Sequence, residues 1–144
     1  MVIDFDLIRE QISVAAGIPI SGKNYYPKLH SIECRINAED PITFMPSPGH
    51  ISQFHPPGGP GVRIDSHIYS GYDVPPNYDS LIAKIITHAE DRETAIKKML
   101  FALDETVITG IKTNIDLHKR LLKSDFFAKG DFTINTLNKF IKES

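Results

Sequence analysis

The chain has 144 residues, a length typical of one domain that buries its own core. Hydrophobic residues make up 41% of the sequence and charged residues 24%, a globular composition that excludes a disordered chain. Its 16 basic and 18 acidic residues give a formal net charge of −2, without the cationic excess that drives binding to nucleic acids.

The sequence also limits where the protein works. No apolar run approaches the roughly 20 residues that span a bilayer, and Asp4 and Asp6 stand where a signal peptide carries basic residues. Cys34 is the only cysteine, which excludes an internal disulfide bond and fits a reducing compartment. We therefore expect a soluble, cytoplasmic protein.

The N-terminal stretch predicts an amphipathic helix. Residues 6–16 place apolar side chains at three- and four-residue spacing, which is the helical period. Asp4 or Asp6 is the expected N-cap, and Gly17 follows the expected end of the helix.

Three stretches further along the chain predict β-structure. From residue 31 the apolar period changes to two, which predicts a half-buried strand over residues 31–38. Residues 51–54 and 62–69 flank a loop rich in Gly and Pro, and we predict that they pair as a hairpin with a long connection. Residues 81–88 are apolar on both faces, as expected of an interior strand.

Helices are predicted in the remainder of the chain. A helix of about four turns follows Asp91, a good N-cap. Its apolar positions are Ile96, Met99, Leu100, Leu103 and Val107. Thr113 or Asn114 is the expected cap of a helix through Lys123, and residues 133–141 predict a short terminal helix. Strands followed by helices indicate an α+β fold, with an antiparallel β-sheet and flanking helices.

Arg35 and Asp79 are the two side chains that could carry chemistry. Arg35 lies in the middle of the predicted strand, on its polar face. That face is either simply solvated, or it holds a fixed guanidinium that offers planar donors to a carboxylate, a carbonyl or a developing oxyanion. Asp79 precedes the apolar strand and is either a turn aspartate or a carboxylate that orients an arginine. The pattern alone leaves both pairs of interpretations open.

Several other kinds of site are disfavoured by the residues themselves. The run from Gly58 to Gly61 lacks the Gly-Lys-Ser/Thr ending of a phosphate-binding loop, so we interpret it as a plain hairpin loop. The six histidines and Cys34 show no metal-ligand spacing, and no metal site is predicted. Cys34 alternates with isoleucines, which favours a buried structural thiol over a nucleophile.

An ordered series of strings along the chain resembles the C-terminal domain of biotin carboxylase. The strings are HSIECRINAEDP at 30–41, PSPG at 46–49, FH at 54–55, PGG at 57–59, GVR at 61–63, DS at 65–66, YDSLIAK at 78–84 and GIKTN at 110–114. The resemblance covers essentially the whole chain. In form it is most similar to the biotin carboxylase subunit of bacterial-type acetyl-CoA carboxylase, although propionyl-, methylcrotonyl- and pyruvate carboxylases share the domain.

The resemblance implies residue roles and cofactors. Enzymes of this family are ligases that carboxylate the biotin of a carrier protein with bicarbonate, ATP and magnesium. It implies that Arg35 is the catalytic residue that contacts the biotin ureido oxygen and the bicarbonate, with Asp79 near it. Ile134 matches an apolar residue at the edge of the adenine pocket, and Arg63 lies in a region that matches a dimer contact. No residue is assigned to a metal.

The resemblance also implies a domain organisation. Residues 1–144 would form one biotin carboxylase C-terminal domain, with a leading helix and loop over 1–22 and the sheet and helices over 23–144. The glycine-rich loop, the magnesium carboxylates and the general base of the family belong to an upstream ATP-grasp part, which we expect to be absent from this chain. ATP and magnesium would then act only in the complete enzyme.

Two functions follow as hypotheses. In the first, the domain contributes Arg35 to an active site shared with the ATP-grasp part, within acetyl-CoA carboxylase and fatty acid synthesis, and is inactive alone. In the second, it is a non-catalytic interaction or dimerisation module. The carrier protein, the ATP-grasp part and a second copy of the chain are the expected partners. A face built for the ATP-grasp part predicts exposed apolar side chains at Leu7 and Ile8.

Overall fold

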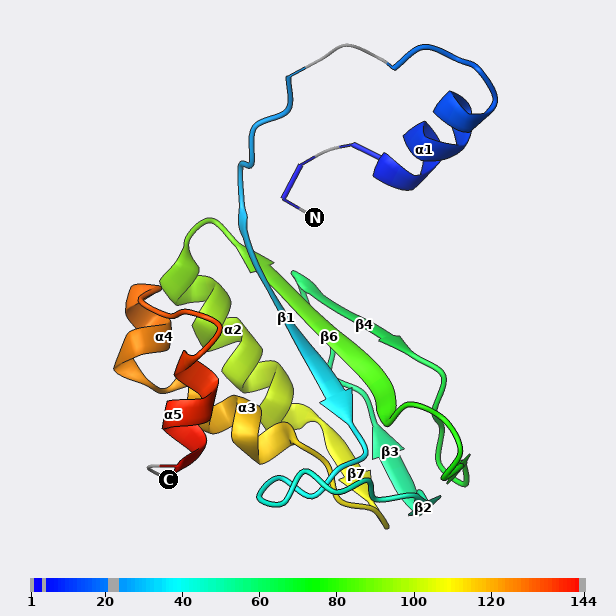
Figure 1. Ribbon diagram of the computed structural model, residues 1–144, viewed down its shortest axis with the longest axis vertical. Coiled ribbons are helices and arrows are strands. Elements are labelled where there is room, and N and C mark those ends of the chain that lie inside the picture. The colour runs from blue at the N-terminus through cyan, green and yellow to red at the C-terminus, as the bar shows by residue number, and fades with distance from the viewer. Residues whose placement is uncertain (1, 4, 21–23, 143–144) are drawn as a thin grey trace.

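The computed structural model describes residues 2–3, 5–20 and 24–142. In chain order the elements are α1 (Leu7–Ala15), β1 (His30–Asn37), β2 (Gly49–His50), β3 (Gln53–His55), β4 (Val62–Ser66), β5 (Asp73–Val74), β6 (Leu81–Ala89), α2 (Arg92–Glu105), β7 (Val107–Thr109), α3 (Ile115–Leu122), α4 (Asp125–Lys129) and α5 (Thr136–Lys142) (Figure 1). The predicted α+β fold with antiparallel strands is confirmed. Asp4 and the predicted boundary between residues 22 and 23 lie outside the described residues.

The main sheet has three antiparallel strands in the order β1-β6-β4, with β6 in the middle. The predicted period of two is confirmed in β1, where Ile32, Cys34 and Ile36 are buried while Glu33 and Arg35 are exposed. Burying an isoleucine side chain contributes about 1.5–3 kcal/mol. The hydrophobic effect therefore fixes which face of β1 turns to the core and which face turns to solvent.

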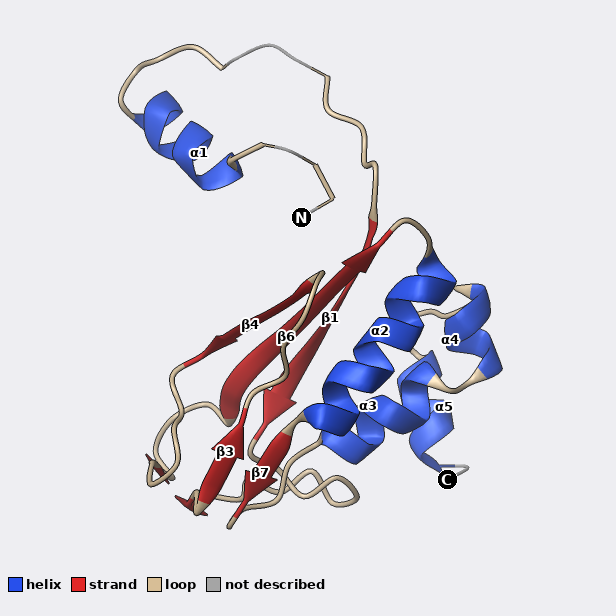
Figure 2. Ribbon diagram, turned by 180° about the vertical axis from the view of Figure 1, so that it is seen from behind, coloured by secondary structure: helices blue, strands red, loops and turns tan. Residues whose placement is uncertain are grey.

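The helices cover the buried face of the main sheet. α2 contacts both β6 and β1, and Figure 2 shows α2, α3, α4 and α5 on the same side of the sheet. The side chains with 0% exposure at this interface include Ile36, Ile85, Met99 and Leu103. Asp91 caps α2 as predicted, because its Oδ1 accepts a hydrogen bond from the Thr94 N–H at 2.8 Å.

The predicted hairpin between residues 51–54 and 62–69 is wrong. β3 pairs with β7 and β4 pairs with β6, so the two runs belong to different sheets. Tight hairpins use short loops rich in Gly and Asn, whereas Pro56, Pro57 and Pro60 restrict the backbone of this connection and lack N–H donors. The loop interpreted above as a hairpin loop is a crossing between two sheets.

Two helix boundaries also differ from the prediction. α2 ends at Glu105, and Val107 belongs to β7, because Thr106 already has an extended backbone with φ −68° and ψ 121°. α5 begins at Thr136 rather than at Thr133. The short helix α4 was not predicted, since its 5 residues give too little periodicity to recognise.

Asn114 is the N-cap of α3, one of the two caps predicted, but its side chain makes no capping hydrogen bond. The side-chain amide bonds to the backbone of β1 instead. Asn114 is buried, with 7% of its surface exposed. The start of α3 is thereby fastened to the edge of the main sheet.

α1 stands apart from the sheet and its helices (Figures 1 and 2). As predicted, Asp6 caps it by accepting the Arg9 N–H at 3.0 Å, and Gly17 follows with φ +83°. None of its residues is buried, and Leu7 and Ile8 are 58% and 65% exposed, which confirms the expected exposure of these two side chains; a docking role for them stays a prediction. Within the described ranges, no helix is long and apolar enough to cross a membrane.

Candidate functional site

Arg35 stands on the solvent face of β1, between the buried residues Cys34 and Ile36. Its side chain is exposed, and it makes no hydrogen bond or ion pair with any other residue that the structure describes. The prediction that the guanidinium points out of the core is confirmed. A planar group with five donors is thus available on a strand whose other face is packed.

Strand pairing places Arg35, Lys84 and Asp65 in one row across the main sheet. Arg35 lies opposite Lys84 in the β1–β6 pair, and Lys84 lies opposite Asp65 in the β4–β6 pair. Residues directly opposite each other point to the same face, with their Cβ atoms about 4.5–5.5 Å apart. The row therefore contains two cations and one carboxylate on the face turned away from the core.

Asp65 is engaged by Arg63, its neighbour on β4. The Arg63 Nε donates to Asp65 Oδ1 and the Nη2 donates to Oδ2, each at 2.9 Å. These hydrogen bonds lower the pKa of the Asp65 carboxyl, and the charge of Lys84 lowers it further. The bonds of Asp65 go to Arg63 and not to Arg35. The predicted dimer contact at Arg63 stays a prediction, and the Arg63 fork already has a partner within the chain.

Lys84 was not recognised as a site residue from the sequence. The run over residues 81–88 is apolar on both faces, and an isolated lysine within it does not indicate which residue it would lie opposite. Its position next to Arg35 depends on the register of two strands that are far apart in the sequence. Only its place in the string at 78–84 could have drawn attention to it.

Asp79 ends the turn that precedes β6. Its Oδ1 accepts a hydrogen bond from the Leu81 N–H at 2.8 Å. Leu81 pairs with Asn37, and it lies about 10 Å along β6 from Lys84 at ordinary strand spacing. No ion pair joins Asp79 to Arg35 in the described part of the chain. The observed geometry is that of a turn aspartate, and its orienting role stays a prediction.

Glu39 fastens this turn to the end of β1. Its carboxylate accepts hydrogen bonds from the Asn37 side-chain amide at 3.1 Å and from the Ser80 hydroxyl. Ser80 follows Asp79 directly, so the bonds of Glu39 hold the turn against the strand that carries Arg35. The two predicted site residues therefore belong to one connected backbone framework.

Ile134 lies in a different part of the molecule. It is 94% exposed and falls between α4 and α5. Those helices lie on the side of the sheet that α2 covers (Figure 2), whereas Arg35 is on the opposite, solvent face. The structure does not bring the two residues together, and the nucleotide-pocket role of Ile134 stays a prediction.

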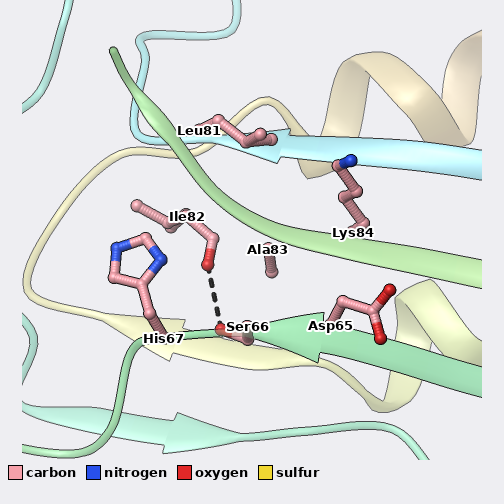
Figure 3. A pocket seen from close by; sticks show the side chains of 7 residues that line it. All are labelled: Asp65, Ser66, His67, Leu81, Ile82, Ala83 and Lys84. Atoms are coloured by element: carbon pink, nitrogen blue, oxygen red, sulfur yellow. Dashed lines mark hydrogen bonds between the residues drawn. The ribbon is translucent and has the colours of Figure 1, made fainter. Parts of the chain in front are cut away.

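A pocket of about 240 Å³ opens beside the start of β6 (Figure 3). Residues 65–67 line one side of it and residues 81–84 line the other. The Ser66 hydroxyl donates to the Ile82 carbonyl at 2.9 Å and joins the two sides. Arg35 is not among the lining residues, so the pocket does not contain the predicted catalytic side chain.

Cys34 is the buried thiol that the sequence predicts. It is 3% exposed, and burial raises its pKa to about 12, with a further contribution from the charge of Glu33. A thiol that stays protonated at neutral pH is a poor nucleophile. The structural interpretation of Cys34 is confirmed.

Comparison with known proteins gives a consistent picture. Residues 33–139 match the family described as the biotin carboxylase C-terminal domain. A biotin carboxylase from Haemophilus influenzae is 55% identical over 141 residues, which cover 96% of this chain and 32% of that protein. The chain thus spans about a third of the length of the curated relatives that it matches.

Solved structures agree with the sequence comparison. The crystal structure of a biotin carboxylase–β,γ-ATP complex from Campylobacter jejuni matches with a TM-score of 0.90 and 46% identity, over 96% of this chain and 31% of that chain. The biotin carboxylase subunit of a pyruvate carboxylase matches with a TM-score of 0.91 and 40% identity, over 99% of this chain and 32% of that chain.

Proposed function

Because this chain belongs to the family of biotin carboxylase C-terminal domains, we propose that it contributes Arg35 to the site at which a biotin carboxylase carboxylates carrier-bound biotin. The observation that carries the proposal is the exposed guanidinium of Arg35. It stands on a packed strand and has no partner among the described residues. An arginine in that position is free to meet a ligand.

The chemistry suits an arginine. The ureido nitrogen of biotin is a poor nucleophile until it loses its proton, and the ureido oxygen then carries negative charge. A preorganised guanidinium stabilises that charge more in the transition state than in the ground state. Arginine serves better than lysine because its fork can meet two oxygens and it stays protonated.

ATP and magnesium belong to the complete enzyme in this proposal. Within the described part of the chain, no group of three His, Cys, Asp or Glu side chains could hold a metal ion. The described residues therefore do not fit a magnesium site. The nucleotide in the Campylobacter jejuni complex supports the use of ATP, and bicarbonate is the carboxyl source in this proposal.

The other predicted residues take supporting roles in the proposal. Asp79, held in the turn before β6, would orient Arg35 once the rest of the enzyme is in place. Ile134, exposed between α4 and α5, would edge the adenine pocket. Arg63 would contribute to contact with a second copy of the chain.

We further propose that the complete enzyme is the biotin carboxylase part of an acetyl-CoA carboxylase, in the cytoplasm and in fatty acid synthesis. Identity favours a biotin carboxylase over the corresponding part of a pyruvate carboxylase, since the Campylobacter jejuni biotin carboxylase is 46% identical and the pyruvate carboxylase subunit is 40% identical. The carrier protein and the ATP-grasp part are the partners that this function requires.

A chimeric enzyme tests the proposal. The Haemophilus influenzae biotin carboxylase would carry this chain in place of its matching third, and carboxylation of free biotin would be measured with ATP and bicarbonate. We expect the chimera to be active and the 144-residue chain alone to be inactive. A chimera that folds and binds ATP but does not carboxylate biotin would favour the alternative, a non-catalytic interaction module.

A further inference from the structure

The outer edge of β1 beside Arg35 is covered by α3. Among the described strands β1 pairs with β6 alone, so its other edge would present unpaired backbone groups. Pairing with β6 also becomes irregular here, because the register shifts between Ile36 and Asn37. The ladder therefore loses its regular register just after Ile36, the residue that follows Arg35.

The side-chain amide of Asn114 takes the place of a neighbouring strand at this edge. Its Oδ1 accepts the Asn37 N–H at 2.9 Å, and its Nδ2 donates to the Arg35 carbonyl at 3.1 Å. The Asn114 backbone N–H also donates to the Asn37 carbonyl at 3.3 Å. An amide offers the same donor and acceptor as a peptide group, and burial of Asn114 shields these bonds from water.

His118, one turn further along α3, adds a second donor to the same carbonyl. Its Nε2 lies 2.8 Å from the Arg35 oxygen. A carbonyl only accepts, so Nε2 carries the proton of this bond. Burial lowers the pKa of His118. The bond is independent of the charge of the ring, because Nε2 keeps its proton in the imidazolium form as well.

We propose that Asn114 and His118 are positioning residues that fix the backbone of Arg35 and thereby aim its guanidinium. The guanidinium makes no bond of its own within the described residues, so its location depends on the backbone that carries it. The proposal rests on the proposed function of Arg35 for its effect on catalysis, but the backbone restraint stands on geometry alone.

The loop before α3 sets where Asn114 lies. Gly110 has φ +98°, and a Cβ added there would lie 2.1 Å from the His50 carbonyl oxygen, so only glycine fits. The Lys112 N–H donates to the Ser47 hydroxyl at 3.0 Å. The close approach of the backbone at Gly110 and the bond of Lys112 thus place the Asn114 amide at the edge of β1.

Substitutions of Asn114 and His118 remove the three side-chain hydrogen bonds to the β1 backbone in different combinations. Asn114→Ala removes both side-chain bonds, whereas Asn114→Asp keeps the acceptor for the Asn37 N–H and loses the donor to Arg35. His118→Ala removes the second donor, and His118→Gln retains an amide that can donate. We expect kcat for biotin carboxylation to fall about 10- to 100-fold in Asn114→Ala, because small misplacements of a catalytic group cost that much. KM for ATP should not change, and His118→Gln should retain the rate that His118→Ala loses.

A double-mutant cycle with Arg35→Ala in the chimeric enzyme tests the proposal. If Asn114 acts through Arg35, Asn114→Ala lowers kcat in the parent but has no further effect when Arg35 is already alanine. An equal loss in both backgrounds, or no loss in a folded parent, would overturn it. Asp91→Ala is the matched control, since it weakens the cap of α2 away from Arg35 and should leave kcat unchanged. If Asn114→Ala does not fold, the double-mutant cycle is run with Asn114→Asp and with His118→Ala instead.

Amide hydrogen exchange of the 144-residue chain gives an independent readout. Exchange of the Asn37 N–H should be at least about tenfold faster in Asn114→Ala than in the parent, because its acceptor is lost. Exchange of Ile85 in the middle of β6 should not change. An unchanged rate at Asn37 would overturn the restraint whatever the enzyme does. If instead Arg35→Ala carboxylates normally while Asn37 exchange responds, the proposed function of Arg35 fails and the restraint stands.

Discussion

Arg35 and Lys84 lie directly opposite each other in the β1–β6 ladder and point to the same face of the sheet. The Arg35 carbonyl bonds to α3, so this is the kind of pair that exchanges no ladder hydrogen bonds. The Cα atoms of such pairs lie about 4.5 Å apart, and like charges placed so are destabilising. The fold therefore holds two cations side by side on the face of the sheet that is turned away from the core.

Removing the Arg35 side chain should leave the fold intact. The side chain is exposed and its guanidinium makes no hydrogen bond with the described residues, and the repulsion from Lys84 is relieved. We expect the unfolding free energy of Arg35→Ala to lie within about 0.5 kcal/mol of the parent or slightly above it. Urea denaturation of the 144-residue chain measures this.

Ile36→Ala is the matched control on the neighbouring position. Ile36 is 0% exposed, and truncating it should cost about 2–5 kcal/mol. A loss of more than about 2 kcal/mol for Arg35→Ala would mean that the guanidinium stabilises the fold, contrary to its exposed position without a bonded partner among the described residues.

α1 should be far less stable than the sheet. It has 9 residues, none of them buried, and isolated helices shorter than about 12–15 residues are marginal in water. We expect its amide hydrogens to exchange orders of magnitude faster than those of β6, as measured by hydrogen exchange with NMR detection. Protection of α1 equal to that of β6 would show that it is held by contacts that the structure does not contain.

His118 should make the fold less stable in mild acid. Burial lowers its pKa below the ordinary value of 6.5, so between the lowered pKa and 6.5 the unfolded chain binds more protons than the folded one. Stability must therefore fall as the pH decreases through that window. Urea denaturation at pH 7 and pH 5.5 should show the loss in the parent and a smaller one in His118→Gln. An equal loss of stability in the parent and in His118→Gln would show that protonation of His118 is not its cause.

Much of the fold could be predicted because local patterns determine it. The alternation in β1 predicted that the side chain of Arg35 points to the opposite face from those of Cys34 and Ile36. The apolar run over residues 81–88 predicted the interior strand. The partner strands of β3 and β4, which are β7 and β6, could not be predicted, because the partner of a strand depends on residues far away in the sequence. The hairpin prediction was wrong for that reason.

The candidate site was predictable in its centre but not in its surroundings. The strand pattern and the resemblance both lead to Arg35. Lys84 lies next to Arg35 because of strand register, and Asn114 lies next to it because of the way α3 packs. Asn114 shows the difficulty, since its sequence position predicts a helix cap while its side chain bonds to a strand. The same residue type serves either purpose, and only tertiary structure decides between them.

If Arg35 stabilises the developing charge on biotin, its removal should lower the rate of biotin carboxylation by the chimeric enzyme. Arg35→Ala should lower that rate by roughly 10²–10³, the usual effect of removing one oxyanion donor. Arg35→Lys should recover little of it, because a point charge cannot reproduce the planar fork. ATP hydrolysis that proceeds without biotin should suffer less. A folded Arg35→Ala enzyme that carboxylates biotin at nearly the parent rate would show that Arg35 does not stabilise this charge.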